Sequence, residues 1–260
     1  MSSIGTILGV LVAVGGLVSA GYGYRRRRRR DAIAAVETTD ALRVTPGPTE
    51  LYGTAEPADG GAMRAPFSEE DCVLAEWKIE EWEESGKHSS WRTEGSGTLA
   101  APFYLDDGTD QVLVRPDEAS VELSGGWGTT EVGVDETPPE PIQAFIDLDA
   151  TPGEPNEALV KSLDWGTQVG DRRYRQRTLA SGEEVYVHGT ATRVGAETFG
   201  GNDFEVVAAA DDGHPDADLF LVADSPESKL LERRRDWVLY LGAGVVGVVA
   251  GGGLLVSSLL

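Results

Sequence analysis

Two long stretches without a charged residue lie at opposite ends of this 260-residue chain, and they restrict its fold more than any other feature. The first covers residues 4–24 and the second covers residues 237–260. As helices that rise about 1.5 Å per residue, each is long enough for the roughly 30 Å hydrocarbon core of a bilayer. We therefore predict a transmembrane helix at each end, with the intervening residues held at the membrane surface.

Arginines flank both apolar stretches on the side of the central segment. Arg25–Arg30 follow the first stretch, and Arg233–Arg235 precede the second. The positive-inside rule then places the central domain in the cytoplasm, so we predict a cell-membrane protein with two spans. A cleaved signal peptide with a cleavage site near residues 18–20 is the alternative for the first stretch, but the basic residues that should precede its apolar run are missing.

Small residues recur every four positions in both apolar stretches. Helices in lipid pack closely through such stripes. The spacing fits an antiparallel pair within one chain, and it equally fits a homo-oligomer held together through the transmembrane faces. The stripes consist of Gly5, Gly9 and Ala13 in the first stretch and of Ala243, Gly247 and Gly251 in the second.

The charge balance excludes one large class of partner. Asp and Glu number 44 against 22 Lys and Arg, a net charge of −22, and only four of the basic residues are lysines. Nucleic-acid affinity depends on basic residues that neutralise phosphates, so we predict no nucleic-acid partner. An acidic, lysine-poor surface is typical of proteins that stay soluble in concentrated salt, and we interpret it as halophilic.

The central segment is predicted to be mainly β-structure. Short runs rich in Val, Tyr, Trp and Thr alternate with Gly, Pro and Asp, and a hairpin turn is predicted at Asp107-Gly108. The fold class is therefore membrane-anchored α+β, mainly β, with two small β-modules flanked by N- and C-terminal transmembrane helices. Strands are predicted at 51–55, 72–83, 90–98, 111–115, 120–123, 173–179, 184–194, 204–209 and 219–222, and helices at 142–147, 155–163 and 227–235.

These elements suggest a division of the chain into six parts. They are a transmembrane helix (4–24), a basic juxtamembrane segment with a helix extension (25–40), a first β-module (41–133), a Pro-rich acidic linker with short helices (134–165), a second β-module (166–226), and a helix (227–260) that continues into the transmembrane span 237–260.

No constellation typical of an active site is present in the sequence. Cys72 opens a predicted strand, so we expect a buried apolar role instead of a nucleophile paired with His88 or His188. The three histidines, including His214, lack paired-ligand spacing and are expected on exposed or strand surfaces. The acidic run 211–218 lacks the EF-hand order and is read as a turn. We predict no catalytic residue, no cofactor and no metal site.

Tryptophan is the residue type that points to recognition. Trp77, Trp82 and Trp91 straddle one predicted hairpin. Such a group either packs in a core or forms a recognition surface, and we expect at least two tryptophans in the core.

Several segments of the chain resemble the GIDE domain family. This is the domain between the membrane helices of mitochondrial MULAN-type E3 ubiquitin ligases, and it also occurs in prokaryotic membrane proteins. The resemblance covers about residues 40–236. It is carried by 65–67, 72–73, 102–107 and 112–116, then by 173–174, Leu179, 181–182, 185–187 and Gly189, and finally by 220–225 and 227–231.

The resemblance implies an association with ubiquitin transfer, which a RING finger performs in the eukaryotic relatives. One cysteine among these 260 residues cannot supply that zinc-binding finger, so the sequence resembles a haloarchaeal-like member without a RING. We expect a non-catalytic interaction or regulatory module with an unknown protein partner beside the bilayer. The alternatives are an E3-like transferase or conjugation factor whose RING comes from another chain, and an envelope structural or stress protein.

Overall fold

The computed structural model describes residues 2–85, 88–148, 170–194, 204–208 and 219–259. These residues form two compact units. The helical unit combines residues 1–37 with 226–260, and the β-unit covers residues 38–225.

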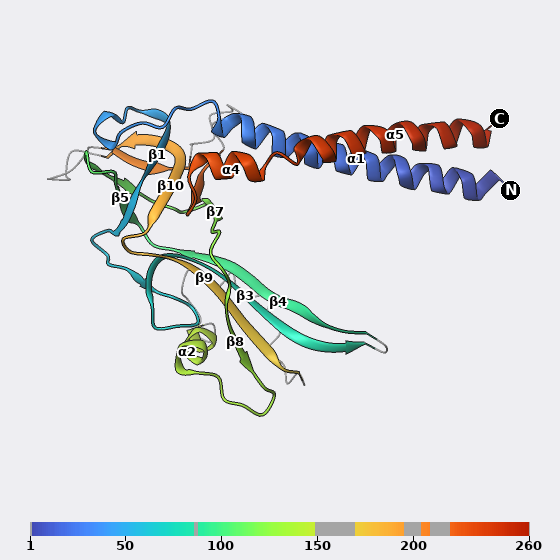
Figure 1. The fold of residues 1–260 in the computed structure, drawn as a ribbon. Helices are drawn as coiled ribbons and strands as arrows, with labels where there is room; N and C mark the ends of the chain where they lie inside the picture. Colours follow the sequence, from blue (N-terminus) through green and yellow to red (C-terminus); the bar gives the residue numbers. More distant parts are fainter. Residues whose placement is uncertain (1, 86–87, 149–169, 195–203, 209–218, 260) are drawn as a thin grey trace. The chain divides into compact units, whose positions relative to one another are not determined.

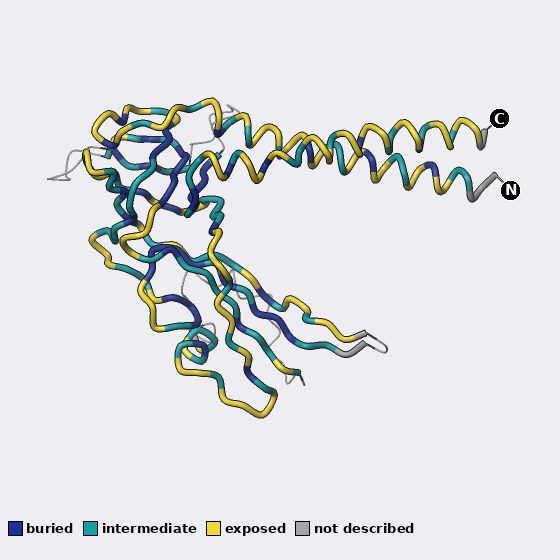
Figure 2. Tube along the Cα trace, in the orientation of Figure 1, coloured by how far each residue is buried: buried dark blue, intermediate teal, exposed yellow. Residues whose placement is uncertain are grey.

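Two long helices make up most of the helical unit. Helix α1 (Ser2–Ile33) and helix α5 (Trp237–Leu259) lie side by side in opposite directions, so the two chain ends lie together (Figure 1). The short helix α4 (Glu227–Arg233) precedes α5. Both long helices are apolar and long enough to cross a membrane, as predicted. Their large apolar residues are mainly exposed, and exposed positions predominate along both helices (Figure 2), which suits a lipid environment.

Glycine and alanine form the contact between α1 and α5. A Cβ atom at Gly16 would lie 2.6 Å from the backbone nitrogen of Val248, and one at Gly244 would lie 2.5 Å from the nitrogen of Ala20. The pairing within one chain that the small-residue spacing allowed is therefore present. The predicted stripe is corrected at one position, because Ala243 is exposed and its neighbour Gly244 makes the contact.

Aromatic and charged residues link the same two helices next to the arginine cluster. The Arg26 guanidinium forms an ion pair with Asp236 and lies 5.4 Å from the ring centroid of Tyr22 and 5.8 Å from that of Tyr240. Ser19 Oγ donates a 2.8 Å hydrogen bond to the Tyr240 carbonyl oxygen. These directional contacts fix the register that the small residues alone leave free to slide.

The β-unit contains a closed five-stranded barrel. Going round it, β1 pairs with β5, β5 with β6, β6 with β11, β11 with β10, and β10 again with β1. Only β6 and β11 run parallel within this ring. If these five strands are numbered 1 to 5 as they occur along the chain, their order round the ring is 1-2-3-5-4. This is the connectivity of the OB-fold, a Greek-key barrel. The strands are β1 (Gly47–Pro57), β5 (Phe103–Asp106), β6 (Gln111–Val114), β10 (Glu184–Arg193) and β11 (Phe204–Val207).

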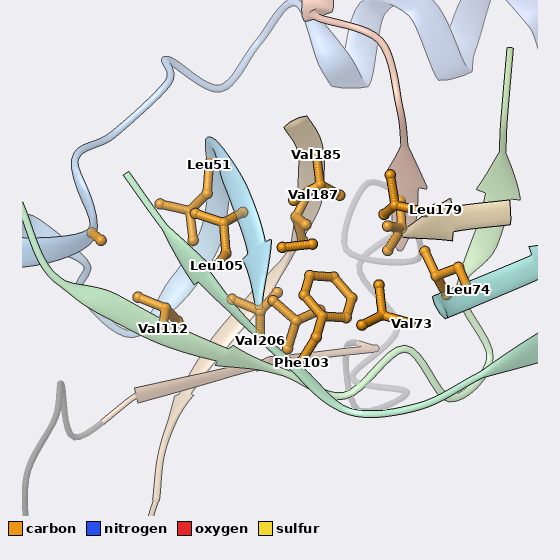
Figure 3. Packing of buried hydrophobic residues seen from close by; sticks show 14 of the residues in the cluster. Leu51, Val73, Leu74, Phe103, Leu105, Val112, Leu179, Val185, Val187 and Val206 are labelled. Carbon is orange, nitrogen blue, oxygen red and sulfur yellow. The ribbon is translucent and has the colours of Figure 1, made fainter. Parts of the chain in front are cut away.

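Two short strands extend this barrel sheet. Strand β12 (Leu221–Ala223) pairs with β10, and β7 (Ser120–Glu122) pairs with β12. A single 3-10 turn, η1 (Ala41–Arg43), precedes β1. Aliphatic side chains and Phe103 fill the barrel interior, and Val73, Leu74 and Leu179 from the second sheet join the same cluster (Figure 3). The two sheets therefore share one hydrophobic core.

A second sheet, the platform sheet, is built on the long hairpin of β3 (Asp71–Ser85) and β4 (His88–Ala100). Strand β9 (Arg172–Ala180) pairs with β3, β8 (Gly128–Val132) pairs with β9, and the two-residue strand β2 (Met63–Arg64) pairs with the start of β3. The helix α2 (Glu140–Leu148) packs Ile142 and Phe145 against one side of this sheet.

Most predicted elements are confirmed. The mainly β segment with two small sheets, flanked by two membrane-length helices, is as expected, and the hairpin at Asp107-Gly108 joins β5 and β6. Strands β2 and β8 were not predicted. The predicted helix at 155–163 lies outside the described residues. The predicted boundary between the first β-module and the linker, after residue 133, does not separate the two sheets, because each sheet contains strands from both sides of it.

Cys72 is buried beside Ala65 and Ala75, which confirms its apolar role. Burial, followed by the charges of Asp71 and Glu70, raises the pKa of the Cys72 thiol from 9.0 to about 11.

We expect iodoacetamide to alkylate Cys72 at least about 100-fold more slowly in the folded chain than in urea at pH 8, because the two-unit rise in pKa lowers the thiolate fraction by that factor. Mass spectrometry of timed samples measures the rate. A Ser89→Cys variant in a Cys72→Ala background serves as the exposed control, and equal rates for the two thiols would contradict the burial of Cys72.

Candidate functional site

The two sides of the platform sheet differ sharply in chemistry. Trp77 and Ile79 of β3 and Tyr174 of β9 point to the side that packs against α2. Because side chains alternate along a strand, their neighbours point to the opposite side. We call that side the arginine face; it carries Glu76, Lys78 and Glu80 from β3 and Arg173, Arg175 and Arg177 from β9.

Cross-strand register places these six side chains in three facing pairs. Glu80 lies opposite Arg173, Lys78 opposite Arg175, and Glu76 opposite Arg177. Arg177 Nε donates to Glu76 Oε2 at 2.6 Å. Glu80 forms ion pairs with both Arg173 and Lys78, and Arg175 Nη1 lies 3.6 Å from Glu80 Oε2. One buried carboxylate therefore serves three cations.

Burial alone would raise the pKa of Glu80, but hydrogen bonds and charges from Arg173 and Lys78 outweigh it. The pKa of Glu80 is consequently lowered from 4.5 to about 2. The Glu80 side chain is only 4% exposed, whereas the arginines and Lys78 are 22–29% exposed. The anion is thus internal, and the cations reach the surface.

Tryptophans lie over the guanidinium groups. Trp91 covers Arg173, with 4.4 Å between the guanidinium carbon and the ring centroid. Trp127 lies 4.8 Å from Arg177 and 5.4 Å from Arg175 by the same measure. These distances are within the range of cation–π attraction. The rings limit the side-chain freedom of the arginines and so hold them ready for a ligand.

The arginine face has a positive excess on a strongly acidic protein. Among the described side chains, four basic groups face Glu76 and Glu80, and an excess of one positive charge remains when exposed Glu131, opposite Arg173 on β8, is included. The Nε atom of Arg175 is buried and has no hydrogen-bond partner among the described residues. Such a surface can bind anionic groups by charge-assisted hydrogen bonds.

The structure separates the three tryptophans of the predicted group. Trp77 is 1% exposed and belongs to the core side. Trp82 and Trp91 are only half-buried, so the expectation of at least two core tryptophans is wrong for this group. Trp82 and Trp91 lie on the arginine-face side, with their ring centroids 5.3 Å apart. Sequence reasoning missed Trp127 and the arginines, although arginine at every second position from Arg173 to Arg177 is a period-two signal for one strand face.

His188 corrects the expectation of an exposed histidine. It is 2% exposed on β10, faces Glu50 of β1 across the pair of strands, and donates from Nδ1 to the Leu219 carbonyl oxygen at 3.0 Å. Glu50 is fully buried and accepts from Thr38 Oγ1 at 2.8 Å. These polar groups contribute to the fold of the barrel sheet. His214 and the side chain of His88 lie outside the described residues.

The barrel surface carries an acidic depression of about 540 Å³ lined in part by Glu56, Asp106, Asp107 and Glu184. Hydrogen-bond donors satisfy both aspartates. Gln111 Nε2 and Gly108 N lower the pKa of Asp106. Burial would raise the pKa of Asp107, but hydrogen bonds from Thr109 in the same loop and from Ala41 of η1 outweigh it, so that pKa is lowered. No group of three potential metal ligands occurs among the described residues, and the acidic run 211–218 lies outside them.

Comparison with known proteins gives one match. The sequence model of the GIDE family, described as E3 Ubiquitin ligase, matches residues 76–256. This range includes most of the platform sheet, every barrel strand except β1, and nearly all of α5. No curated protein and no solved structure matches the chain. Because the match covers well over half of the sequence and includes a membrane-length helix, this chain belongs to the GIDE family of E3 ubiquitin ligase domains.

Proposed function

We propose that the protein is a non-catalytic binding module that recognises a protein partner through the arginine face while both chain ends anchor it in the membrane. The single observation that supports this most is the row Arg173, Arg175 and Arg177, held under tryptophan rings on one side of a sheet whose other side is already packed. Structural arginines need their carboxylates, but together with Lys78 the row makes four cations against the three described carboxylates Glu76, Glu80 and Glu131.

Capture from native membranes tests the proposal. We expect Trp91→Ala and Arg175→Gln to lose at least 90% of a specifically captured protein after gentle crosslinking, because each removes part of the cation–π surface. Quantitative mass spectrometry measures the loss. Arg92→Gln is the matched control, since Arg92 is exposed and its register with Glu81 places it on the other side of the sheet.

The outcome that contradicts the proposal is retention of every partner by both variants at normal expression. Trp77→Ala does not serve this purpose, because Trp77 fills the core side and its truncation would destabilise the domain by about 3–5 kcal/mol. Near-ultraviolet circular dichroism of each purified variant shows whether the fold is kept.

A second candidate function is supported by the family description. As part of an E3 ubiquitin ligase, the module would recruit a target while a RING on another chain performs the transfer. The same capture experiment separates the transferase complex from simple binding. The transferase complex is favoured if a zinc-binding RING protein is captured and if the amount of ubiquitin-like conjugates decreases in Arg175→Gln. Stable partners without any change in conjugates favour simple binding.

We further propose that the β-unit lies in the cytoplasm. Arginines flank both membrane-length helices on the side of this unit, and moving them outward against the membrane potential is costly.

A membrane-impermeant maleimide is therefore expected to label Ser89→Cys, in a Cys72→Ala background, at least tenfold more after lysis than in intact cells. Gel fluorescence measures the labelling. Equal labelling of intact and lysed cells would reverse the orientation.

A further inference from the structure

We infer that the ligand of the arginine face is an extended acidic segment of a partner protein, with carboxylates at alternate positions and Arg175 as its main contact. This inference rests on the proposed function, because it assigns a partner chemistry to the same face.

The pair of Lys78 and Arg175 favours the binding of a further anion, because both cations share the single carboxylate of Glu80. These two cations lie directly opposite each other on antiparallel strands. Like charges in that position are destabilising. Glu80 is the only carboxylate of the arginine face within 4 Å of either, and it already accepts from Arg173. An added carboxylate between Lys78 and Arg175 would remove the repulsion.

Arg175 is the cation with the weakest internal contacts on this face. Arg173 and Arg177 each donate from Nε to a carboxylate of β3. Within the described part of the chain, Arg175 has a single ion-pair contact, at 3.6 Å, and its side chain is 27% exposed. Its guanidinium therefore keeps terminal nitrogens for a ligand, and the planar fork of these nitrogens suits a carboxylate.

The arginine spacing favours an extended peptide. Side chains two residues apart on a strand are about 7 Å apart, which is also the spacing of alternate side chains in any extended chain. A peptide that lies along β9 can thus place successive carboxylates near successive arginines. Trp91 and Trp127, over opposite ends of the row, provide apolar walls for the intervening side chains.

The net charge favours this segment over an anionic bilayer or a nucleic acid. Both of those carry negative charge over a wide surface, and the protein itself has a net charge of −22. At 0.1 M salt, where the Debye length is about 10 Å, repulsion would therefore act over the whole approaching surface, whereas a short segment meets mainly the local positive face. A second copy of this chain is also acidic and forms a further arm of the test.

Fluorescence anisotropy with the full chain in neutral phosphatidylcholine nanodiscs tests the inference. The probe is a labelled peptide with glutamate at every second position and threonine between, compared with a peptide of the same residues in which the glutamates are consecutive. We expect the alternating peptide to bind more tightly. We expect Arg175→Gln to weaken its binding at least tenfold and Arg92→Gln at most twofold, although both remove one positive charge.

Equal weakening by the two substitutions, or no preference for the alternating peptide, would overturn the inference. Tighter binding of oligothymidine, or of nanodiscs to phosphatidylglycerol vesicles, would assign the face to nucleic acid or membrane. Self-association in light scattering that Arg175→Gln abolishes would assign it to a second copy. Partner capture that depends on Arg175 without peptide binding would leave the proposed function standing and reject only the acidic segment.

Discussion

Replacing Glu80 by glutamine is expected to destabilise the β-unit by about 3 kcal/mol at pH 7. The substitution removes the buried carboxylate that serves Lys78, Arg173 and Arg175, and it leaves three cations facing one another. Breaking a buried ion pair by removing one partner typically costs 3–5 kcal/mol. Urea unfolding followed by tryptophan fluorescence measures the loss.

The same substitution should remove a defined part of the acid sensitivity. The pKa of Glu80 is lowered from 4.5 to about 2 in the folded protein, so its stabilising effect is complete above about pH 5 and disappears as the pH falls toward 2. The stability difference between the native protein and Glu80→Gln should therefore shrink over that interval. Glu131→Gln, an exposed carboxylate on the same sheet, should change the free energy of unfolding by less than about 0.5 kcal/mol.

If Glu80→Gln is as stable as Glu131→Gln at pH 7, the carboxylate does not hold the arginine face together. The comparison also separates stability from binding. A variant that stays folded but binds more acidic peptide than the native protein would show that the ligand and Glu80 compete for the same cations.

The second large effect is expected in the helix pair. Gly16→Leu places a side chain where a Cβ atom alone would lie 2.6 Å from the Val248 backbone nitrogen, and backbone cannot move aside like a flexible side chain. The helices must separate by on the order of 2–3 Å toward ordinary interaxial distances. Leucine has a higher helix propensity than glycine, so the helix itself is retained.

Spin labels on cysteines at Leu17 and Val246, in a Cys72→Ala background in bilayers, report this separation by electron paramagnetic resonance. Both sites are exposed in the structure. Gly15→Leu is the matched control, because a Cβ atom at Gly15 meets nothing within 4 Å. An unchanged distance distribution in Gly16→Leu, or equal shifts in the two variants, would show that the glycine contact does not hold the pair.

Local patterns were sufficient to predict most individual elements. Uncharged residues over the length of a bilayer predict the two helices, since a helix satisfies every backbone polar group within itself. The alternation around Trp77 and Ile79 predicts β3, because side chains change sides at every residue. Strand β8 was missed because its sequence, Gly128–Val132, contains two adjacent threonines and lacks the apolar alternation on which the prediction depends.

The candidate site depends on contacts between residues far apart in the sequence. Glu80 and Arg173 are separated by 93 positions, and Trp127 reaches the face from a third segment. The alternation of side chains along β9 by itself predicts that Arg173, Arg175 and Arg177 lie on one side of the strand. It does not show which strand lies beside β9. Pairing register decides that, and a one-residue slip would exchange the two sides of the sheet.

The amino-acid sequence alone therefore established the membrane-length helices, the mainly β central segment and the absence of a RING-type cysteine set within these residues, because hydropathy, period and composition are local properties. The tertiary structure decided that the helices pair through Gly16 and Gly244, that the strands close into a barrel, and that the arginines meet Glu80. Those outcomes depend on which distant segments come into contact, and the free energy of such packing is a property of the assembled residues.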